Sequence, residues 1–442
     1  MLTINVSLLS GRTVPVPAAP DALVGDLRKA IQSQLALGPL ALLSGSGARL
    51  LASQTLKEAQ LKSGDAVTAV AVANLRLFAH RLGRAFAALK PNGQVVSWGD
   101  PECGGESSRV QKRLSHVKHI CGSGGAFAAI RADGSVVTWG HPGDGGVVNF
   151  RVSDVKRLCA TCSAFAALHK DGKVSTWGAP NYGETTAPLR GVVDLCASSA
   201  AFAARKKDGN VIAWGSSSDG GDSSQVSSQL MDVTQLAASN SAFAALRKDG
   251  KVICWGDQRC GGDVSQVEQQ LRRVQAIFAS GSAFAALRAD YSVVVWGATL
   301  PPTNPLPGVR HVCGSGGAMA ALRIDGTVVT WGCAQEGGDS SAVQAQLRDV
   351  KEVASTDAAF AAVKADGSVV TWGKASFGGD SSKVQQKPGL DSDGAIEELQ
   401  NVESVLGSWS AFAALRKDGL VVTWGDRFNG GDSSAVQDDL MI

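Results

Sequence analysis

The sequence predicts a mainly β protein, an array of nine similar units preceded by a small α+β domain. The pair Trp-Gly occurs nine times, and a Phe or Met precedes each Trp by twelve positions. Asp-Gly or Asn-Gly stands between them in eight units, and this is the strongest short-range signal for a β-hairpin. The spacing of 35 to 41 residues, with 52 before the last Trp, is typical of a propeller, solenoid or other repeat array.

Composition narrows the class of protein. The chain has 42 Lys and Arg against 40 Asp and Glu, and no basic stripe stands out, so we expect neither nucleic acid nor a membrane as partner. The nine cysteines form no disulfide-framework spacing, and an odd number suits a reducing compartment. The chain shows no leader pattern at its start and no run of 18 apolar residues. We therefore expect a cytoplasmic protein, with the nucleus as the alternative.

Residues 1–73 contain no copy of the repeat and are predicted to form a separate domain. Alternating apolar residues predict strands around 3–9 and 14–16. Helical spacing of apolar residues predicts a helix over 23–35, and further short strands are expected near 40–43, 50–51 and 66–73. This order of elements is that of a β-grasp domain.

The order, and the segments 8–13, 24–32 and 47–70, resemble ubiquitin-like domains. That resemblance implies an apolar sheet patch that docks on ubiquitin-pathway receptors, and it carries over to Leu9 and Val70. The third member of the patch falls near 42–44, where the segment lengths disagree. No Gly-Gly follows the last strand, so the resemblance implies an integral docking domain rather than a conjugated modifier.

The hairpin at 242–256 represents the repeated unit. A two-residue turn at Asp249-Gly250 would place Ala244 opposite Trp255 and Phe243 opposite Gly256, so that each large ring faces a residue with little or no side chain. Both faces of the hairpin are apolar, so copies of the unit must cover it on both sides. In the unit that lacks Gly, Tyr291 must accept a positive φ or the turn must change type.

The segment after Trp-Gly varies between units. Six units continue with Gly-Gly-Asp or Gly-Gly-Glu, and in five of them a Ser stands three residues before a Gln or Glu, which is the capping-box spacing of a short helix. Three units substitute other loops, such as 301–305, and an insertion at 387–394 precedes the last unit. In repeat proteins such departures most often carry function.

Residues 74–442 resemble nine tandem RCC1-like repeats, because they repeat Ala-x-Ala-Leu, Asp-Gly and Val-x-x-Trp-Gly in this order. The resemblance implies a β-propeller-type array. The His that the family places after Cys-Gly is absent, and nine units exceed the usual seven. A closed ring and an open superhelical stack therefore both remain possible architectures.

The sequence predicts no catalytic site, metal or cofactor. Cys159 and Cys162 have the Cys-x-x-Cys spacing of a redox or half-zinc site, but units that lack a Cys at the position of Cys159 carry Ala, Phe or Leu there, which favours packing. The six histidines have no metal-ligand spacing. The Gly-rich loops at 122–125 and 314–317 lack the following helix and Lys of a phosphate loop.

We therefore expect a non-catalytic protein–protein interaction scaffold or adaptor, linked to ubiquitin signalling through its N-terminal domain. The alternative, implied by the RCC1-like resemblance, is a guanine-nucleotide exchange factor for a small GTPase. A glycan-binding array is a more distant third hypothesis.

Overall fold

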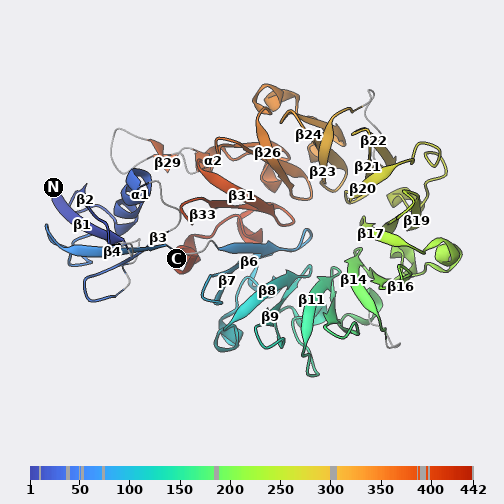
Figure 1. The fold of residues 1–442 in the computed structure, drawn as a ribbon, viewed down its shortest axis with the longest axis horizontal. Helices are drawn as coiled ribbons and strands as arrows, with labels where there is room; N and C mark the ends of the chain where they lie inside the picture. Colours follow the sequence, from blue (N-terminus) through green and yellow to red (C-terminus); the bar gives the residue numbers. More distant parts are fainter. Residues whose placement is uncertain are drawn as a thin grey trace.

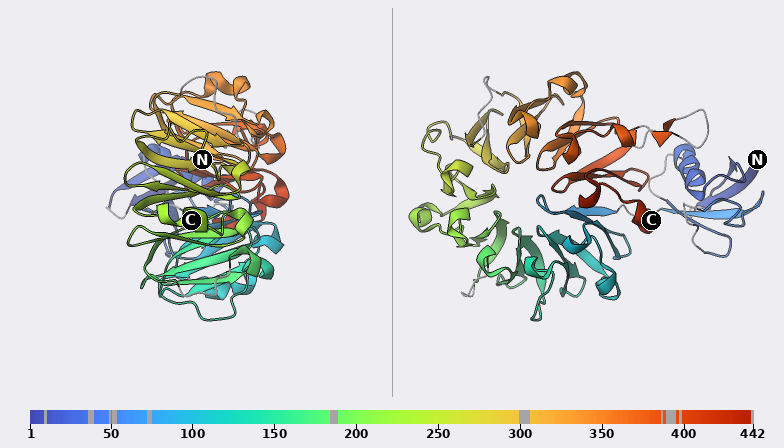
Figure 2. Two further views of the ribbon diagram at one scale, coloured as in Figure 1. Left: turned by 90° about the vertical axis from the view of Figure 1, so that its right-hand side faces the viewer. Right: turned by 180° about the vertical axis from the view of Figure 1, so that it is seen from behind.

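The computed structural model describes residues 1–8, 11–35, 40–48, 50, 54–71, 75–183, 189–298, 306–385, 387–388, 395–396 and 399–440. A small N-terminal domain lies beside a ring of nine three-stranded sheets (Figure 1). Figure 2 shows the same arrangement from the side and from behind.

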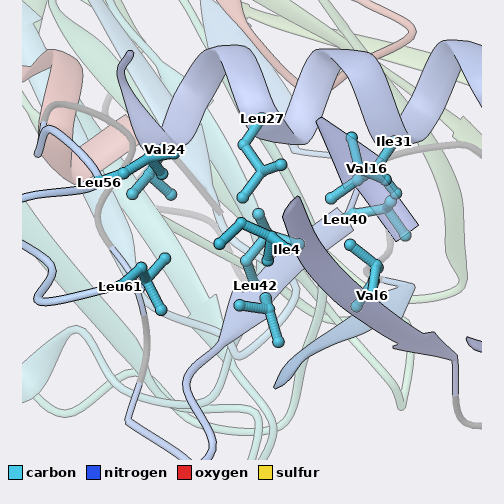
Figure 3. Close-up of a cluster of buried hydrophobic side chains, with 12 residues drawn as sticks. Ile4, Val6, Val16, Val24, Leu27, Ile31, Leu40, Leu42, Leu56 and Leu61 are labelled. Carbon is cyan, nitrogen blue, oxygen red and sulfur yellow. The ribbon is translucent and has the colours of Figure 1, made fainter. Parts of the chain in front are cut away.

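The N-terminal domain is a four-stranded sheet covered on one face by a helix. Its elements are β1 (Leu2–Leu8), β2 (Thr13–Ala18), α1 (Val24–Leu35), β3 (Leu40–Leu43) and β4 (Ala66–Ala71). The strand order is β2-β1-β4-β3, with β1 and β4 parallel and the other pairs antiparallel. Leu27 and Ile31 of α1 belong to one buried cluster with Ile4 and Leu42 of the sheet (Figure 3).

Most of the elements expected in this domain are present. The strands around 3–9 and 14–16, the helix over 23–35 and the strand at 40–43 match β1, β2, α1 and β3. The strand expected at 50–51 is not formed at Leu50, and residue 51 lies outside the described residues. The boundary predicted between residues 73 and 74 also lies outside them, so it stays a prediction.

Each repeated unit contributes one antiparallel sheet of three consecutive strands. The first three units contain β5 (Arg76–Ala79), β6 (Ala85–Leu89) and β7 (Val95–Gly99); β8 (Val117–Gly122), β9 (Ala126–Arg131) and β10 (Val136–Gly140); β11 (Val155–Ala160), β12 (Ala164–His169) and β13 (Val174–Gly178). The next three contain β14 (Val192–Ala197), β15 (Ala201–Lys206) and β16 (Val211–Gly215); β17 (Val233–Ala238), β18 (Ala242–Arg247) and β19 (Val252–Gly256); β20 (Val274–Ala279), β21 (Ala283–Arg288) and β22 (Val293–Gly297).

The last three units contain β23 (Val309–Gly314), β24 (Ala318–Arg323) and β25 (Val328–Gly332); β26 (Val350–Ser355), β27 (Ala359–Lys364) and β28 (Val369–Gly373); β31 (Val402–Gly407), β32 (Ala411–Arg416) and β33 (Val421–Gly425). The first strands of neighbouring units, such as β17 and β20, contact one another around the centre of the ring (Figure 1). In the insertion before unit 9, β29 (Lys387–Pro388) pairs with β30 (Ala395–Ile396).

The predicted hairpin register was wrong by one residue. Phe243 lies opposite Trp255 and Ala244 lies opposite Cys254. The reason is a three-residue loop, in which Arg247 N–H donates to Lys251 O at 2.9 Å and Gly250 N–H donates to Arg247 O at 2.9 Å. Gly250 has φ +81°, as expected for a type I turn followed by a left-handed residue. Tyr291 accepts the same backbone conformation, with φ +61°.

As a consequence, the large rings face each other instead of facing small residues. Phe243 stacks on Trp255 with ring centroids 5.3 Å apart, and eight units have such a pair at 5.2–5.4 Å. Unit 7 has Met319 in place of Phe. This geometry adds aromatic attraction to the burial of both rings.

The expectation that neighbours cover both faces of each hairpin is confirmed. Ala242, Ala244 and Leu246 share a buried cluster with the next unit, and Phe243 and Trp255 share one with the preceding unit. The Trp255 indole donates to Gly220 O of the preceding unit at 2.9 Å. A Cβ added to Gly220 would lie 2.6 Å from the Phe243 ring, so glycine is required there.

The ninth unit packs on the first in the same way. The Trp98 indole donates to Gly430 O at 3.1 Å, and a Cβ on Gly430 would lie 2.5 Å from the Phe86 ring. Phe86 and Trp98 share a buried cluster with Ala411 and Ala413. The array therefore closes into a ring through packing between separate sheets, and the open superhelical alternative is wrong.

The segments after Trp-Gly form short 3-10 helices in place of a fourth strand. They are η1 (Pro101–Cys103), η2 (Ser108–Arg113), η3 (Pro142–Asp144), η4 (Pro180–Tyr182), η5 (Ser217–Asp219), η6 (Ser224–Gln229), η7 (Gln258–Cys260), η8 (Ala334–Glu336), η9 (Ser341–Gln346), η10 (Ala375–Phe377), η11 (Arg427–Asn429) and η12 (Ser434–Val436). Two short α-helices, α2 (Ser382–Gln385) and α3 (Gln437–Leu440), complete this set.

The capping-box interpretation of these segments was wrong. Ser341 N–H donates to the Asp339 carboxylate at 2.9 Å, so the Asp of Gly-Gly-Asp caps the turn. The Gln344 side chain instead donates to Val328 O at 3.0 Å, and its carbonyl accepts from Ser340 Oγ at 2.9 Å. The Ser-Gln pattern therefore fastens the helix to the third strand of its own unit.

Candidate binding face

The ring has two faces that differ in the connecting segments they carry. The turns between second and third strands, such as 248–250, lie on one face, which we call the turn face. The loops between first and second strands lie on the other, together with the short helices that directly follow Trp-Gly; we call this the loop face. Strand polarity fixes this division, since successive antiparallel strands reverse direction at alternate faces.

A belt of backbone hydrogen bonds runs around the centre of the loop face. Eight bonds of 2.7–3.0 Å each join one unit to the next, from unit 2 round to unit 1: Gly124 to Cys162, Cys162 to Ser199, Ser199 to Asn240, Asn240 to Gly281, Gly281 to Ser315, Gly316 to Asp357, Asp357 to Trp409 and Trp409 to Gly83. In each bond the first residue donates its N–H. The belt holds the loops of different units in one fixed arrangement.

In seven units, a hydroxyl group fastens the loop to the helix that follows in its own unit. A Ser or Thr stands four residues before the Phe or Met in eight units. Ser239 Oγ, for example, donates to Cys260 O at 2.9 Å and accepts from Ala242 N–H at 3.1 Å. This role of the hydroxyl was not predicted, although its repeated position is visible in the sequence.

Unit 1 departs from this pattern and fills the centre of the belt. Ala79 pairs with Phe86, whereas Gly122 pairs with Phe127 in unit 2, so unit 1 has two additional loop residues, His80 and Arg81. The Arg81 guanidinium donates to the Asn240 side chain and, at 3.4 Å, to Ser315 O. It thereby connects unit 1 to units 5 and 7 across the ring.

The two inserted side chains are half-buried, and their pKa values are shifted accordingly. Burial lowers the pKa of His80 to about 4, with a further lowering from Arg81, and His80 Nδ1 accepts from Leu82 N–H at 3.2 Å as a neutral ring does. Burial also lowers the pKa of Arg81, while the Asp357 carboxylate acts to raise it. Beside them remains a hollow of about 140 Å³.

Of the two cysteines with the Cys-x-x-Cys spacing, Cys162 lines this hollow and Cys159 lies on β11. Cys121 and Cys159 are half-buried at equivalent positions of the first strands of units 2 and 3. Burial raises the pKa of both thiols, to about 11 for Cys159. Because thiolate is the reactive form, this environment disfavours redox or metal chemistry and supports the packing interpretation. In the described ranges no group of three or more His, Cys, Asp or Glu is arranged to hold a metal.

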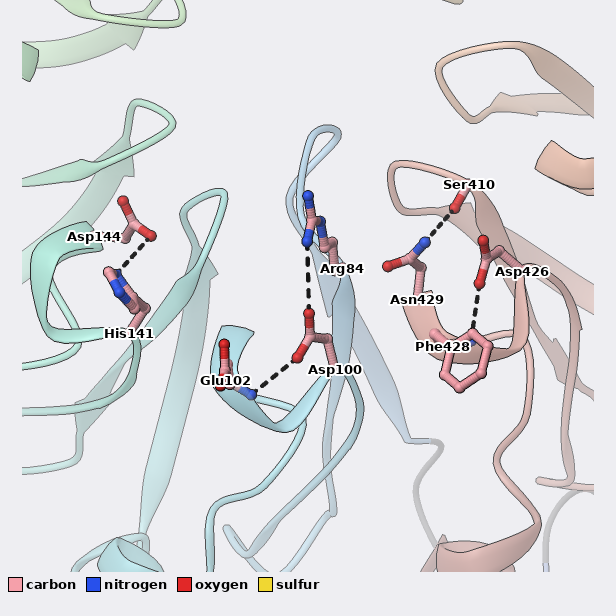
Figure 4. A network of polar contacts seen from close by, with 9 residues as sticks. All are labelled: Arg84, Asp100, Glu102, His141, Asp144, Ser410, Asp426, Phe428 and Asn429. Carbon is pink, nitrogen blue, oxygen red and sulfur yellow. Dashed lines mark hydrogen bonds and ion pairs between the residues drawn. The ribbon is translucent and has the colours of Figure 1, made fainter.

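Away from the centre, the loop face carries polar contacts between exposed side chains (Figure 4). Arg84 Nη1 lies 3.8 Å from an Asp100 carboxylate oxygen, and the other Asp100 oxygen accepts from Glu102 N–H at 3.0 Å. In unit 2, His141 Nδ1 lies 3.0 Å from Asp144. These carboxylates support the short helices and do not converge on one point.

The predicted docking residues lie on the N-terminal domain. Val70 is half-buried on β4 opposite Ala41, on the sheet face that points away from α1, since the adjacent Val67 and Ala69 positions are buried. Leu9 lies outside the described residues. Leu42, within the range expected for the third patch member, is buried under α1.

The other side of α1 faces the ring. Figures 1 and 2 show the helix between its own sheet and unit 9. Gln32 Nε2 donates to Asp418 O at 3.5 Å, and Gln32 and Arg28 are both buried. The helical face of the domain is thus occupied, while the sheet face with Val70 is accessible.

One of the repeated units matches a known protein family. Residues 233–261, which span β17 to the end of η7, match the Regulator of chromosome condensation (RCC1) repeat. The repeats are RCC1-like. The ubiquitin-like character of the N-terminal domain has no corresponding match. No curated protein matches the chain.

Similar solved structures are distant in sequence. Yeast RCC1 (Prp20) bound to Kap60 has a TM-score of 0.41 and 15% identity, covering 77% of this chain and 87% of that one. Prp20p from Saccharomyces cerevisiae has a TM-score of 0.38 and 16% identity, with 69% and 82% covered. The ectodomain of the Arabidopsis thaliana receptor kinase ACR4 has a TM-score of 0.38 and 16% identity, with 68% and 97% covered.

A membrane-spanning helix would need a long apolar run. None of the helices in the described part of the chain has the length and apolar character to cross a bilayer.

Proposed function

We propose that this protein is a non-catalytic binding scaffold whose ring presents loop-face side chains to a protein partner. The observation that carries the proposal is the belt, because it fixes loops from all nine units relative to one another while their side chains differ. Rigid presentation of variable side chains reduces the ordering cost of binding. The thiols near the centre have raised pKa values, which disfavours the reactive thiolate form there.

The N-terminal domain extends this proposal to ubiquitin signalling. Its sheet face, with Val70, is open while its helix is held against unit 9. A receptor that recognises the apolar patch of ubiquitin-like domains would reach Val70 without displacing the ring.

The test uses the full chain and a ubiquitin-interacting helix as probe, with binding measured by calorimetry. Val70→Ala should weaken binding. Val14→Ala is the matched control, since Val14 is also half-buried but lies on the edge strand at the α1 side of the sheet. Equal binding by wild type and both variants, or no binding at all, would reject the ubiquitin link while leaving the ring scaffold untouched.

The alternative is guanine-nucleotide exchange on a small GTPase, which the RCC1-repeat match of residues 233–261 favours. A GDP-release assay over a panel of small GTPases separates the two functions. Accelerated release by the full chain would replace the scaffold proposal, and unaltered release with stable GTPase binding would support a scaffold.

A further inference from the structure

We propose that the loop face at the junction of units 8, 9 and 1 binds an acidic peptide segment of a protein partner that also supplies an apolar anchor. The surface, which we call the seam patch, consists of Phe377, Trp409 and Phe428 with Arg84, Lys374 and Arg427. The inference rests on the scaffold function proposed above and names the site and the chemistry of its ligand.

Trp409 departs from the sequence pattern of the repeat. The chain has ten tryptophans, and Trp409 is the one that does not belong to a Trp-Gly pair. It occupies a belt position where the other units carry Gly, Cys, Ser, Asn or Asp. Its ring is half-buried and meets Phe377 of unit 8 edge-on, with centroids 5.7 Å apart. The ring packing of unit 9 already uses Phe412 and Trp424, so Trp409 is not needed for that core.

Phe428 is the most exposed of the described Phe, Trp and Tyr side chains. It is 81% exposed at the middle of η11, where units with the equivalent helix carry Glu, Gly, Asn, Ser, Arg or Gln. Its backbone is nonetheless fixed, because its N–H donates to Asp426 at 2.9 Å. The adjacent Asn429 is buried and its amide donates to Ser410 Oγ at 2.9 Å, which ties Phe428 to the Trp409 loop (Figure 4). A large apolar ring held in water is typical of an interaction site.

Three cations surround these aromatic rings. The Arg84 guanidinium lies 5.3 Å from the Trp409 ring centroid, and Lys374 Nζ lies 4.6 Å from the Phe377 centroid. Arg427, next to Phe428, is 78% exposed. Other units have Gly, Ser or Ala at the position of Arg84, so this cation is also a departure from the repeat.

The seam patch offers a partner three positive charges, on Arg84, Lys374 and Arg427. Arg84 and Arg427 have carboxylate neighbours at 3.8 and 3.0 Å, but exposed pairs of this kind contribute little and exchange readily for a partner's carboxylate. Asp426 is committed to the N–H of Phe428. Aromatic rings with Arg are the composition of interface hot spots, and Arg binds carboxylates in a bidentate manner.

A single nucleic acid strand also combines anionic groups with stacking partners. The protein segment is favoured because Asp100, Glu102 and Asp426 lie on the same face (Figure 4) and would repel a continuous run of phosphates. A short acidic segment places its charges only where Arg84, Lys374 and Arg427 lie.

The experiment is a selection of random displayed peptides on the full-length protein, followed by anisotropy measurements with the enriched peptides. We expect enriched peptides to combine acidic residues with an apolar anchor. Phe428→Ala and Arg427→Gln should each weaken their binding by about tenfold or more. Phe428 and Arg427 are exposed, so neither substitution disturbs the ring core.

Matched controls come from the other units of the same face. Arg259 of unit 5 is 92% exposed in a helix equivalent to η11, and Tyr182 of unit 3 occupies the position equivalent to Phe377. Arg259→Gln and Tyr182→Ala should leave the affinity within about twofold of wild type.

Several results would overturn the proposal. Enrichment of neutral or basic peptides, no enrichment, or stronger binding of an oligothymidine strand would each reject an acidic peptide ligand. Acidic peptides whose binding survives Phe428→Ala and Arg427→Gln would reject this location while leaving the scaffold function intact. The scaffold function itself fails separately, if the GDP-release assay shows exchange activity.

Discussion

The substitution Gly220→Ala tests how neighbouring units are joined. Gly220 has φ +89°, and a Cβ there would lie 2.6 Å from Cδ2 of Phe243. Phe243 is fully buried and stacked on Trp255 at 5.3 Å, so its ring has no room to move away. Left-handed backbone costs an alanine about 1–2 kcal/mol. Overpacking adds about 1–3 kcal/mol, so the expected loss is about 2–5 kcal/mol.

The matched control is Gly250→Ala in the adjacent hairpin turn. Gly250 has φ +81°, but the nearest atom to its added Cβ is 3.6 Å away. This variant should lose only the backbone contribution of about 1–2 kcal/mol. The difference between the two variants therefore isolates the contact with the Phe243 ring.

Urea unfolding, followed by both circular dichroism and tryptophan fluorescence, measures the free energy of unfolding when the two probes coincide. In a Phe243→Ala background, Gly220→Ala should cost no more than Gly250→Ala, because the ring it meets is gone. If the Gly220→Ala protein is as stable as the Gly250→Ala protein, the proposed close contact between Gly220 and the Phe243 ring is refuted.

Three further predictions follow from other parts of the ring. His80 has a pKa of about 4 in the folded protein against about 6.5 when unfolded, so its protonation favours unfolding. The free energy of unfolding should therefore fall by about 3 kcal/mol as the pH drops from 6.5 to 4. His80→Gln should flatten this pH dependence in urea titrations. Trp98→Phe and Trp255→Phe each remove an indole hydrogen bond to a glycine carbonyl and should lower the free energy of unfolding by about 1–3 kcal/mol. The two values should agree within about 0.5 kcal/mol, because the closing junction has the same contacts as the internal ones. A much smaller loss for Trp98→Phe would argue against closure. Cys333 is exposed and should react with a thiol reagent in the native protein, whereas Cys254, buried and with a raised pKa, should react only after denaturation, which mass spectrometry of the labelled peptides would establish.

Sequence reasoning found the repeated unit because its signals are local. The Asp-Gly turn, the apolar runs and the period follow directly from residue order, and they led to the hairpins and to their mutual coverage. The register failed because Asp249-Gly250 suits both a two-residue turn and the last two positions of a three-residue loop. A one-residue difference then exchanged the partner of Trp255 from Ala244 to Phe243.

Features that depend on the ring as a whole could not be predicted from the sequence. Ring closure depends on the angle between successive sheets, which no local pattern encodes. Seven bonds of the belt join residues 34 to 52 positions apart, and the eighth joins Trp409 to Gly83, 326 positions away. The role of Arg81 likewise depends on Asn240, a distant residue in the sequence. The half-buried Trp409 is an exception, because a tryptophan without a following glycine can be recognised in the sequence.

Eight junctions of the ring have an axial backbone bond, but none is found between units 1 and 2 among the described residues. There, Gly83 N–H donates instead to His80 O at 2.9 Å, within its own loop. Units 1 and 2 are still joined on the turn face, where Val117 N–H donates to Gly93 O at 3.0 Å. On the axial side, unit 1 is held to units 5 and 7 by the Arg81 side chain. Removal of that side chain should therefore loosen the inner edge of unit 1 while its sheet stays packed on unit 2.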